Sequence, residues 1–289
     1  MESALRRAFA GVGVGGDAIQ ATTRASDEAE LARRAIDDGA TTIVAVGGDG
    51  TWSNVANAIL RSGADRRLAL VAAGTGNDFA KSLGVPAHDL MASARLAVDG
   101  PDDRVDVGRV GDEWFLNALG FGFDTAVLEE AAKVHWLSGT LLYAYTALHQ
   151  LLRYEGLRVA HDGDTVDAWS RKLLVVVANG RWFGGAFQVA PSASLADGML
   201  DLVAIPDASS LERLRLFMRA THGRHVALPS VEVRQARRFS LRFDAPPPYD
   251  LDGELRRASS SVVEIECVPA ALRIVGATPT RESHVRQPG

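Results

Sequence analysis

Two glycine-rich turns, each between an apolar run and a helix-like segment, constrain the fold of this chain most strongly. The first turn, 47–51 (GGDGT), follows the run 41–46 and precedes a helical pattern at 52–60. The second turn, 74–78 (GTGND), follows the run 68–73 and precedes another helix-like segment. Glycine lets the backbone approach an anion closely, and the helix behind each turn adds the positive end of its dipole. These consecutive strand–turn–helix units predict a parallel sheet whose turns bind phosphate.

Each turn also contains an acidic residue, Asp49 in the first and Asp78 in the second. A carboxylate inside a loop that favours anions is best explained by a divalent cation or by acid–base chemistry. The first turn could instead be a tight strand-to-helix connection without a ligand. In the second, Asn77 or Asp78 could cap the following helix, a role compatible with ligand binding.

The chain has 289 residues, 47% of them hydrophobic, which is enough for two domains. Helix-like and strand-like segments alternate over residues 1–101, which predicts a Rossmann-like, three-layer α/β domain with a parallel sheet. Short apolar strands dominate residues 102–278, interrupted by helices at 138–153 and 210–221, and predict a mainly antiparallel β-sandwich. Residues 279–289 are polar and lack periodicity, so we expect a loose tail.

Individual elements follow from periodicity and turn residues. In the first domain, helices are expected at 26–38 and 89–98. In the second, Gly111-Asp112 is a hairpin signal between two strands. The strands expected in the second domain are 104–110, 113–121, 171–178, 186–191, 199–206, 231–236, 239–244, 261–268 and 272–276.

The net charge and the cysteine content of the chain argue against several classes of protein. A net charge of −5 and a pI near 5.8 argue against a general nucleic-acid binder, so no nucleic-acid partner is expected. Cys267 is the only cysteine, which excludes an intramolecular disulfide and a cysteine metal cluster and fits a reducing, cytoplasmic setting. No apolar run reaches the length of a membrane-spanning helix, so we expect at most peripheral contact with the inner membrane surface.

The segment 136–154 allows two interpretations. Its apolar residues recur at helical spacing, which favours the buried stripe of a packed helix. A lipid-facing lid or a membrane-contacting helix is the alternative, with Trp136 and Leu137 at its rim. The apolar positions are Leu141, Leu142, Tyr145, Leu148, Leu151 and Leu152.

Several motifs in this sequence resemble those of the bacterial diacylglycerol kinase-like lipid kinases, which are related more distantly to sphingosine kinases and NAD kinases. The two glycine turns are specific in combination, and the later motifs support them through their order and spacing. The matching stretches are VAVGGDGT (44–51), AAGTGNDFAKSLGVP (72–86), RVDVGRV (104–110) with EWFLNALGFGFD (113–124), NGRWFGGAFQVAPSASLADGMLDLV (179–203) and LDGE (251–254).

The resemblance implies a two-domain kinase that holds ATP in the cleft between its domains and moves the γ-phosphoryl group to a lipid hydroxyl. The simplest reaction is diacylglycerol to phosphatidic acid. Phosphoryl transfer relies on phosphate-cradling amides, Mg²⁺ and a carboxylate that takes the hydroxyl proton. Kinases of sphingoid bases, of ceramide or of NAD are the enzymatic alternatives, and a lipid- or nucleotide-binding relative with little turnover is the non-enzymatic one. A homodimer is possible.

The resemblance also assigns roles to single residues. Asp49 would act on Mg²⁺ or in catalysis, and Glu254 matches the proposed general base. On the residues alone, the Asp252-Gly253 hairpin signal would leave Glu254 an exposed strand residue. The implied nucleotide contacts are Thr23, Gly47, Gly48, Asp49, Gly50, Thr51, Trp52, Ser53, Thr75, Asn77 and Asp78.

A structural magnesium site is implied at Ser194, Asp197 and Met199. Asp197 would give its carboxylate and the other two residues their main-chain carbonyls, a set of hard oxygen ligands that suits Mg²⁺.

The chain departs from the family pattern at two places. Family members usually open with a strand and an Asn-Pro-x-Ser-Gly loop, whereas residues 1–10 match the helix that normally follows that loop. Either the sequence begins too late or the protein lacks its first strand, which would leave a sheet edge unpaired. The second departure is Asn54, where glutamate is common; an amide keeps hydrogen bonding but loses the charge.

Overall fold

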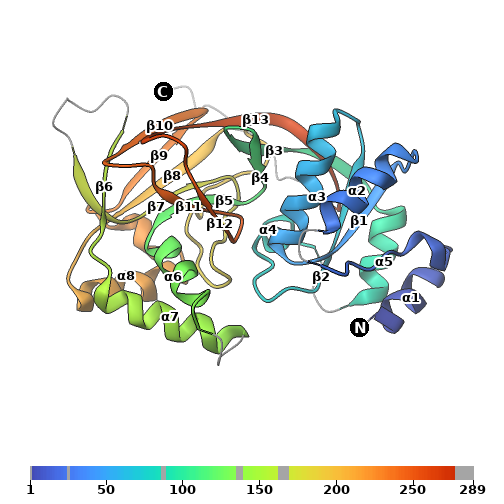
Figure 1. Ribbon diagram of the computed structural model, residues 1–289, viewed down its shortest axis with the longest axis horizontal. Helices are drawn as coiled ribbons and strands as arrows, with labels where there is room; N and C mark the ends of the chain where they lie inside the picture. The colour runs from blue at the N-terminus through green and yellow to red at the C-terminus, as the bar shows by residue number, and fades with distance from the viewer. Residues whose placement is uncertain (1, 25–26, 86–88, 135–138, 162–168, 277–289) are drawn as a thin grey trace, which may run out of the picture.

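A computed structural model (Figure 1) describes residues 2–24, 27–85, 89–134, 139–161 and 169–276, and the statements below concern these residues. The expected tail 279–289 lies outside them, as do Trp136 and Leu137. The chain forms two halves side by side, with the N-terminal half on the right of Figure 1 and the C-terminal half on the left. No helix within these residues is both long and apolar enough to span a membrane.

The N-terminal half has three layers, as predicted. Its strands β1 (Thr42–Gly47) and β2 (Arg67–Ala72) pair in parallel, and β2 pairs in parallel with the end of β13 (Val262–Val275). The apolar residues alternate along the strands. Ile43 and Leu68 pack with the core under α2 (Asp27–Asp37) and α3 (Asp49–Ser62), whereas Ala69 and Val71 pack with α1 (Glu2–Ala10) and α5 (Leu90–Asp99). The helices expected at 1–10, 26–38 and 89–98 are therefore confirmed in the described residues.

The C-terminal half is a β-sandwich in which every strand pair is antiparallel. The alternation along β7 (Ser170–Ala178) separates its two apolar faces, since Val175 and Val177 enter the core between the strands while Leu174 and Val176 face the helices. The helices are α6 (Phe123–Ala131), α7 (Gly139–Arg153) and α8 (Ser210–Ala220). The strands are β3 (Asp102–Val110), β4 (Glu113–Phe115), β5 (Ala118–Gly122), β6 (Leu157–His161), β7 (Ser170–Ala178), β8 (Leu200–Pro206), β9 (Glu232–Ala236), β10 (Arg238–Phe243), β11 (Pro248–Leu251) and β12 (Glu254–Arg257).

Two long strands connect the halves. β13 pairs with β10 in the C-terminal half and, after a register shift between Val268 and Leu272, with β2 in the N-terminal half. β3 runs antiparallel to β13 through both parts, along the top of Figure 1. Because these strands take part in both halves, the domain limits at residues 101 and 278 stay predictions.

The structure corrects several sequence-based expectations in this half. The expected strand 113–121 is broken, because the N–H groups of Leu116 and Asn117 donate to the Asp252 carboxylate rather than to a neighbouring strand. Residues 186–191 form only an isolated bridge, and the expected strands 261–268 and 272–276 form one strand, β13. Helix α6 and strand β6 were not predicted.

Candidate active site

The two glycine turns lie against each other at the ends of β1 and β2. Gly48 is the N-cap of α3 and offers no side chain to the N–H groups of the first turn, which leaves them for another acceptor. A Cβ atom on Gly74 would lie 2.6 Å from the Cα of Gly48, so the close contact between the turns requires glycine. The carbonyl of Gly47 accepts hydrogen bonds from Ala73 and Gly74, at 2.8 and 3.1 Å. The turns therefore form a single structural unit.

Asp49 and Asn77 hold this unit in shape. The Asp49 carboxylate accepts the N–H groups of Asp78 and Phe79, at 3.1 and 3.0 Å, and so caps α4 (Asp78–Leu83) from the opposite turn. Asn77 has a φ of 52° and bonds Gly74 through both side-chain atoms. Burial raises the pKa of Asp49, and the nearby Asp78 carboxylate raises it further. The Asp49 and Asp78 carboxylates therefore lie close to each other at the glycine turns.

Asp78 joins the second turn to the C-terminal half. Its carboxylate accepts the N–H of Gly185 at 2.7 Å and pairs with Lys81 at 2.9 Å. The Lys81 ammonium also donates to the Gly185 carbonyl at 2.5 Å and lies over the Trp182 ring. The NGRWFGG segment thus closes over the glycine turns.

A cavity of about 560 Å³ extends from the glycine turns into the C-terminal half. Its first end is polar and its far end is apolar, lined by side chains of α6, α7 and α8 such as Phe123, Leu142 and Phe217. The predicted nucleotide-binding residues that line the first end are Gly48, Asp49, Gly50, Thr75 and Asp78. An apolar chamber that opens onto glycine turns with free N–H groups suits a ligand with a polar head and a hydrocarbon body.

Three further carboxylates, Asp124, Asp250 and Asp252, line this cavity. Asp252 has a φ of 51° and accepts the N–H groups of Leu116, Asn117 and Ala118, at 2.7, 2.9 and 3.0 Å. Burial raises the pKa of Asp252 to about 6 and that of Asp124 to about 7. These acids were not singled out by the sequence reasoning, although the GFGFD and LDGE motifs contain them.

Asp250 is the third carboxylate lining this part of the cavity. Burial raises its pKa, as does the neighbouring charge of Asp124, and it accepts the N–H of Gly253 at 2.6 Å.

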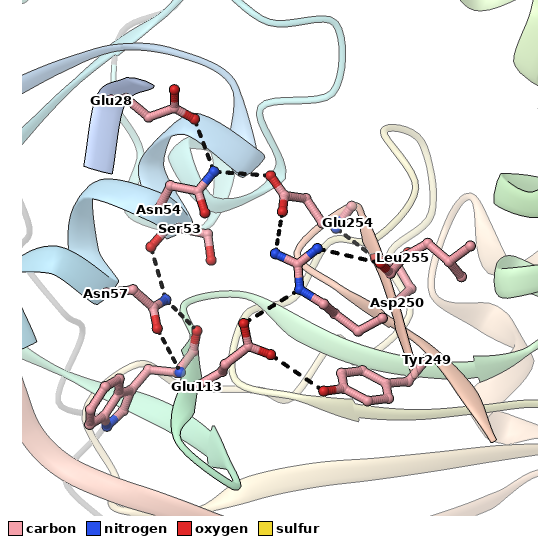
Figure 2. A network of polar contacts seen from close by, with 12 residues as sticks. Glu28, Ser53, Asn54, Asn57, Glu113, Tyr249, Asp250, Glu254 and Leu255 are labelled. Atoms are coloured by element: carbon pink, nitrogen blue, oxygen red, sulfur yellow. Dashed lines mark hydrogen bonds and ion pairs between the residues drawn. The ribbon is translucent and has the colours of Figure 1, made fainter. Parts of the chain in front are cut away.

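Glu254, the expected general base, lies beside the first glycine turn. A Cβ atom on Gly50 would lie 3.3 Å from its Oε1. Asn54 Nδ2 donates to Glu254 at 3.0 Å and to Glu28 at 2.9 Å, so one amide bridges two carboxylates (Figure 2). Arg256 bonds the other Glu254 oxygen at 2.6 Å. Gly253 lines the cavity, whereas Glu254 itself lies next to it.

The structure places the other predicted nucleotide residues outside the cavity wall. Thr23 donates its N–H and hydroxyl to Asp27 at the start of α2. Trp52 is fully buried and donates its indole N–H to the Ala45 carbonyl, at 3.2 Å. Ser53 is buried and bonds the Asp252 side chain. The residues absent from the lining are Thr23, Gly47, Thr51, Trp52, Ser53 and Asn77, and their contacts with nucleotide stay predictions.

Ser194, Asp197 and Met199 lie together in the turn before β8. The Asp197 carboxylate accepts the Met199 N–H at 3.0 Å and the Gln235 amide at 3.1 Å. Desolvation raises the pKa of Asp197, and the charge of Asp106 raises it further. Among the described residues, no three acidic, histidine or cysteine side chains group as metal ligands. A magnesium site built from one carboxylate and two main-chain carbonyls therefore stays a prediction.

Two family models together cover most of the chain. Residues 6–110 match the diacylglycerol kinase catalytic domain, and residues 117–276 match the YegS C-terminal NAD kinase beta sandwich-like domain. A structure titled as a putative diacylglycerol kinase from Bacillus anthracis has a TM-score of 0.67 at 23% identity, with 88% of this chain and 83% of that chain covered. The fold expected from the sequence is therefore confirmed.

The curated relatives are named as diacylglycerol kinases or as probable lipid kinases. A diacylglycerol kinase of Mycobacterium tuberculosis is 32% identical over 269 residues, which cover 91% of this chain and 83% of the relative. A diacylglycerol kinase of Bacillus subtilis is 30% identical over 237 residues, 81% of this chain and 78% of the relative. A probable YegS-like lipid kinase of Xanthomonas axonopodis pv. citri is 33% identical over 267 residues, 89% of this chain and 85% of the relative. The chain is thus a kinase and belongs to the diacylglycerol kinase family of lipid kinases.

Proposed function

We propose that this kinase transfers the γ-phosphoryl group of ATP to the hydroxyl of a membrane lipid, most simply diacylglycerol, which yields phosphatidic acid. The cavity is the observation that carries this proposal. One end is formed by the glycine turns, which suit a phosphate. The other end is formed by apolar side chains on helices of the C-terminal half, which suit a hydrocarbon chain. The curated diacylglycerol kinases in the family support the same acceptor.

The N-terminal half supplies the phosphate site. The N–H groups at the start of α3 lack a side-chain acceptor, and the contact between Gly48 and Gly74 opens the backbone of both turns to a phosphate. The carboxylates of Asp49 and Asp78 would hold Mg²⁺, because each keeps oxygen lone pairs beyond its N–H bonds. When bound, Mg²⁺ neutralises charge on the phosphates.

The C-terminal half supplies the base. Glu254 would accept the proton of the lipid hydroxyl, a step that needs an ionised carboxylate fixed beside the phosphate site. Asn54 and Arg256 donate to its two oxygens and so fix its orientation. Glutamate, which is common at position 54 in the family, would add a negative charge beside the carboxylates of Glu28 and Glu254. Asn54 instead donates a hydrogen bond to each of them.

A sphingoid base is the second candidate acceptor, and one observation favours it. The buried Asp250 and the half-buried Asp124 are carboxylates in the cavity wall, and carboxylates there would suit an acceptor that carries an amine as well as a hydroxyl. Phosphorylation of NAD fits less well, because the apolar end of the cavity would face a polar dinucleotide. We place the reaction at the cytoplasmic surface of the inner membrane, where ATP and a lipid acceptor meet.

The test is incubation with labelled ATP, Mg²⁺ and a mixed lipid extract, followed by identification of the labelled product. Phosphatidic acid is the expected product, and a phosphorylated sphingoid base would select the second candidate. Glu254→Gln should abolish transfer and leave ATP binding nearly intact, while the exposed Glu264→Gln on β13 serves as the matched control. Label found only in a soluble dinucleotide, independent of detergent or vesicles, would contradict the proposal.

A further inference from the structure

The exposed apolar side chains of the described residues concentrate on two helices. Most of the large hydrophobic side chains that these residues expose belong to α7 or α8, and three of them are at least 60% exposed, Leu148, Leu152 and Met218. Contiguous exposed apolar surface on a protein marks a place of interaction. The exposed apolar residues of the two helices are Tyr145, Leu148, Leu152, Leu211, Leu214 and Met218.

On each helix these side chains share one face. On α8 the positions 211, 214 and 218 recur at helical spacing, and on α7 the positions 145, 148 and 152 do the same. The two helices contact each other and lie together at the lower edge of the C-terminal half (Figure 1). We call the six exposed apolar residues, together with the exposed arginines described next, the α7–α8 surface.

The charge of the α7–α8 surface is positive. Arg215 and Arg219 are exposed and lie one residue after Leu214 and Met218, on the same side of α8. Arg153 is exposed at the end of α7, a helix without acidic residues. The acid of α8, Glu212, bonds the N-cap Ser209 in a capping box. Apolar side chains beside arginines form the pattern of helices that lie in a membrane interface rich in anionic lipid.

We propose that the α7–α8 surface docks the kinase on an anionic lipid bilayer. The inference rests on the proposed function, since a lipid acceptor resides in the bilayer. The inner faces of the same helices line the apolar end of the cavity, through residues such as Leu142, Leu216 and Phe217, so docking brings that end next to the bilayer. A symmetric dimer through this surface would bring arginines of both copies together, which opposes self-association. Because the chain's net charge is −5, its overall charge does not attract it to an anionic bilayer.

Cosedimentation with vesicles tests the proposal without ATP. Wild type should bind vesicles of phosphatidylcholine with added phosphatidylglycerol, less so at high salt and less so to phosphatidylcholine alone. Leu148→Glu and Met218→Glu should each weaken binding by at least about tenfold, because each removes one inserted apolar side chain. Arg215→Gln with Arg219→Gln should reduce the preference for phosphatidylglycerol. Met91→Glu, at an exposed apolar position on α5, is the matched control and should bind like wild type.

A second readout separates docking from chemistry. Phosphorylation of short-chain diacylglycerol in detergent micelles should stay at the wild-type rate in the Leu148 and Met218 variants, and circular dichroism melts should confirm that they fold. Wild type that does not bind anionic vesicles would overturn the proposal, whereas failure of wild type in the micelle assay would count against the proposed function. If the two glutamate variants bind vesicles like wild type but turn a dimer into a monomer, the surface is a contact between copies, and membrane docking is wrong.

Discussion

Replacing Asn54 by aspartate would put a third carboxylate between two others. The Asn54 amide donates to Glu28 at 2.9 Å and to Glu254 at 3.0 Å (Figure 2). Aspartate has nearly the same shape, so the backbone and the packing of α3 stay as they are. The substitution therefore changes two attractive contacts into two repulsive ones at the expected general base.

The size of the effect follows from these distances. Two unit charges 4 Å apart interact by about 1 kcal/mol in water and by about 4 kcal/mol at an effective dielectric constant near 20. The Glu254 side chain is 30% exposed, so its environment lies between these limits. A lost hydrogen bond to a charged group adds roughly 1.5–3 kcal/mol. Repulsion of about 2 kcal/mol that moves the ionised Glu254 carboxylate out of its position corresponds to a fall in kcat of about 30-fold.

Steady-state kinetics and calorimetry measure the effect. In Asn54→Asp, kcat for lipid phosphorylation should fall by about 30-fold or more at neutral pH, while the Kd for ATP changes little. Asn54→Ala removes the donor without adding charge and should fall less. Adding Glu28→Gln to Asn54→Asp should restore part of the rate, because one neighbouring charge is gone. A wild-type kcat in Asn54→Asp would refute the reasoning.

Three further substitutions test other parts of the structure. In Asp252→Asn a buried group with a pKa of about 6 no longer titrates. Because this folded-state pKa exceeds the unfolded value, raising the pH from 4 to 7 should lower the unfolding free energy of wild type by about 2.4 kcal/mol more than that of the variant, and parallel urea curves would contradict this. If Asp197 binds Mg²⁺, the ion should raise the melting temperature of wild type but not of Asp197→Ala; equal shifts would remove Asp197 from the site. Arg213→Leu leaves the largely buried Asp207 carboxylate unpaired and should cost about 3 kcal/mol in urea unfolding, with Arg215→Leu as an exposed control; an equal effect of both would be unexpected.

Local sequence signals account for the parts of the fold that the sequence predicts. The strand–turn–helix units around Gly48 and Gly74 are each set within about ten residues, so apolar runs and glycines suffice to predict them. The close contact between these two glycines follows from parallel pairing of β1 and β2, which brings their carboxyl ends to one edge. Asp49 and Asp78 were expected at this edge for the same reason.

Contacts between distant residues explain what the sequence could not show. Asp252 accepts N–H groups from residues 116–118, and this pairing over more than 130 positions breaks a strand that looks continuous in sequence. Asn54 seemed to have lost an ionic role, yet its amide joins Glu28 to Glu254. Such partners depend on the tertiary fold, which local periodicity does not encode.

Helix α7 shows a different limit of periodicity. Its apolar positions were expected to form a buried stripe, and Leu151 is indeed buried. Tyr145, Leu148 and Leu152 are exposed instead, so that interpretation is wrong for them, and the side chain of Leu141 lies outside the described residues. A helix that lines an apolar cavity on one side and is apolar on the other carries the same residues as a core helix.

Calorimetric titration with ATP and Mg²⁺ tests the central claim, that the paired glycine turns hold the phosphates. Wild type should bind ATP saturably. Gly74→Ala should weaken binding by at least about tenfold and still fold, because its Cβ would force the Gly48 backbone away from the phosphate position. Absence of ATP binding by wild type, or unchanged affinity in Gly74→Ala, would contradict the claim.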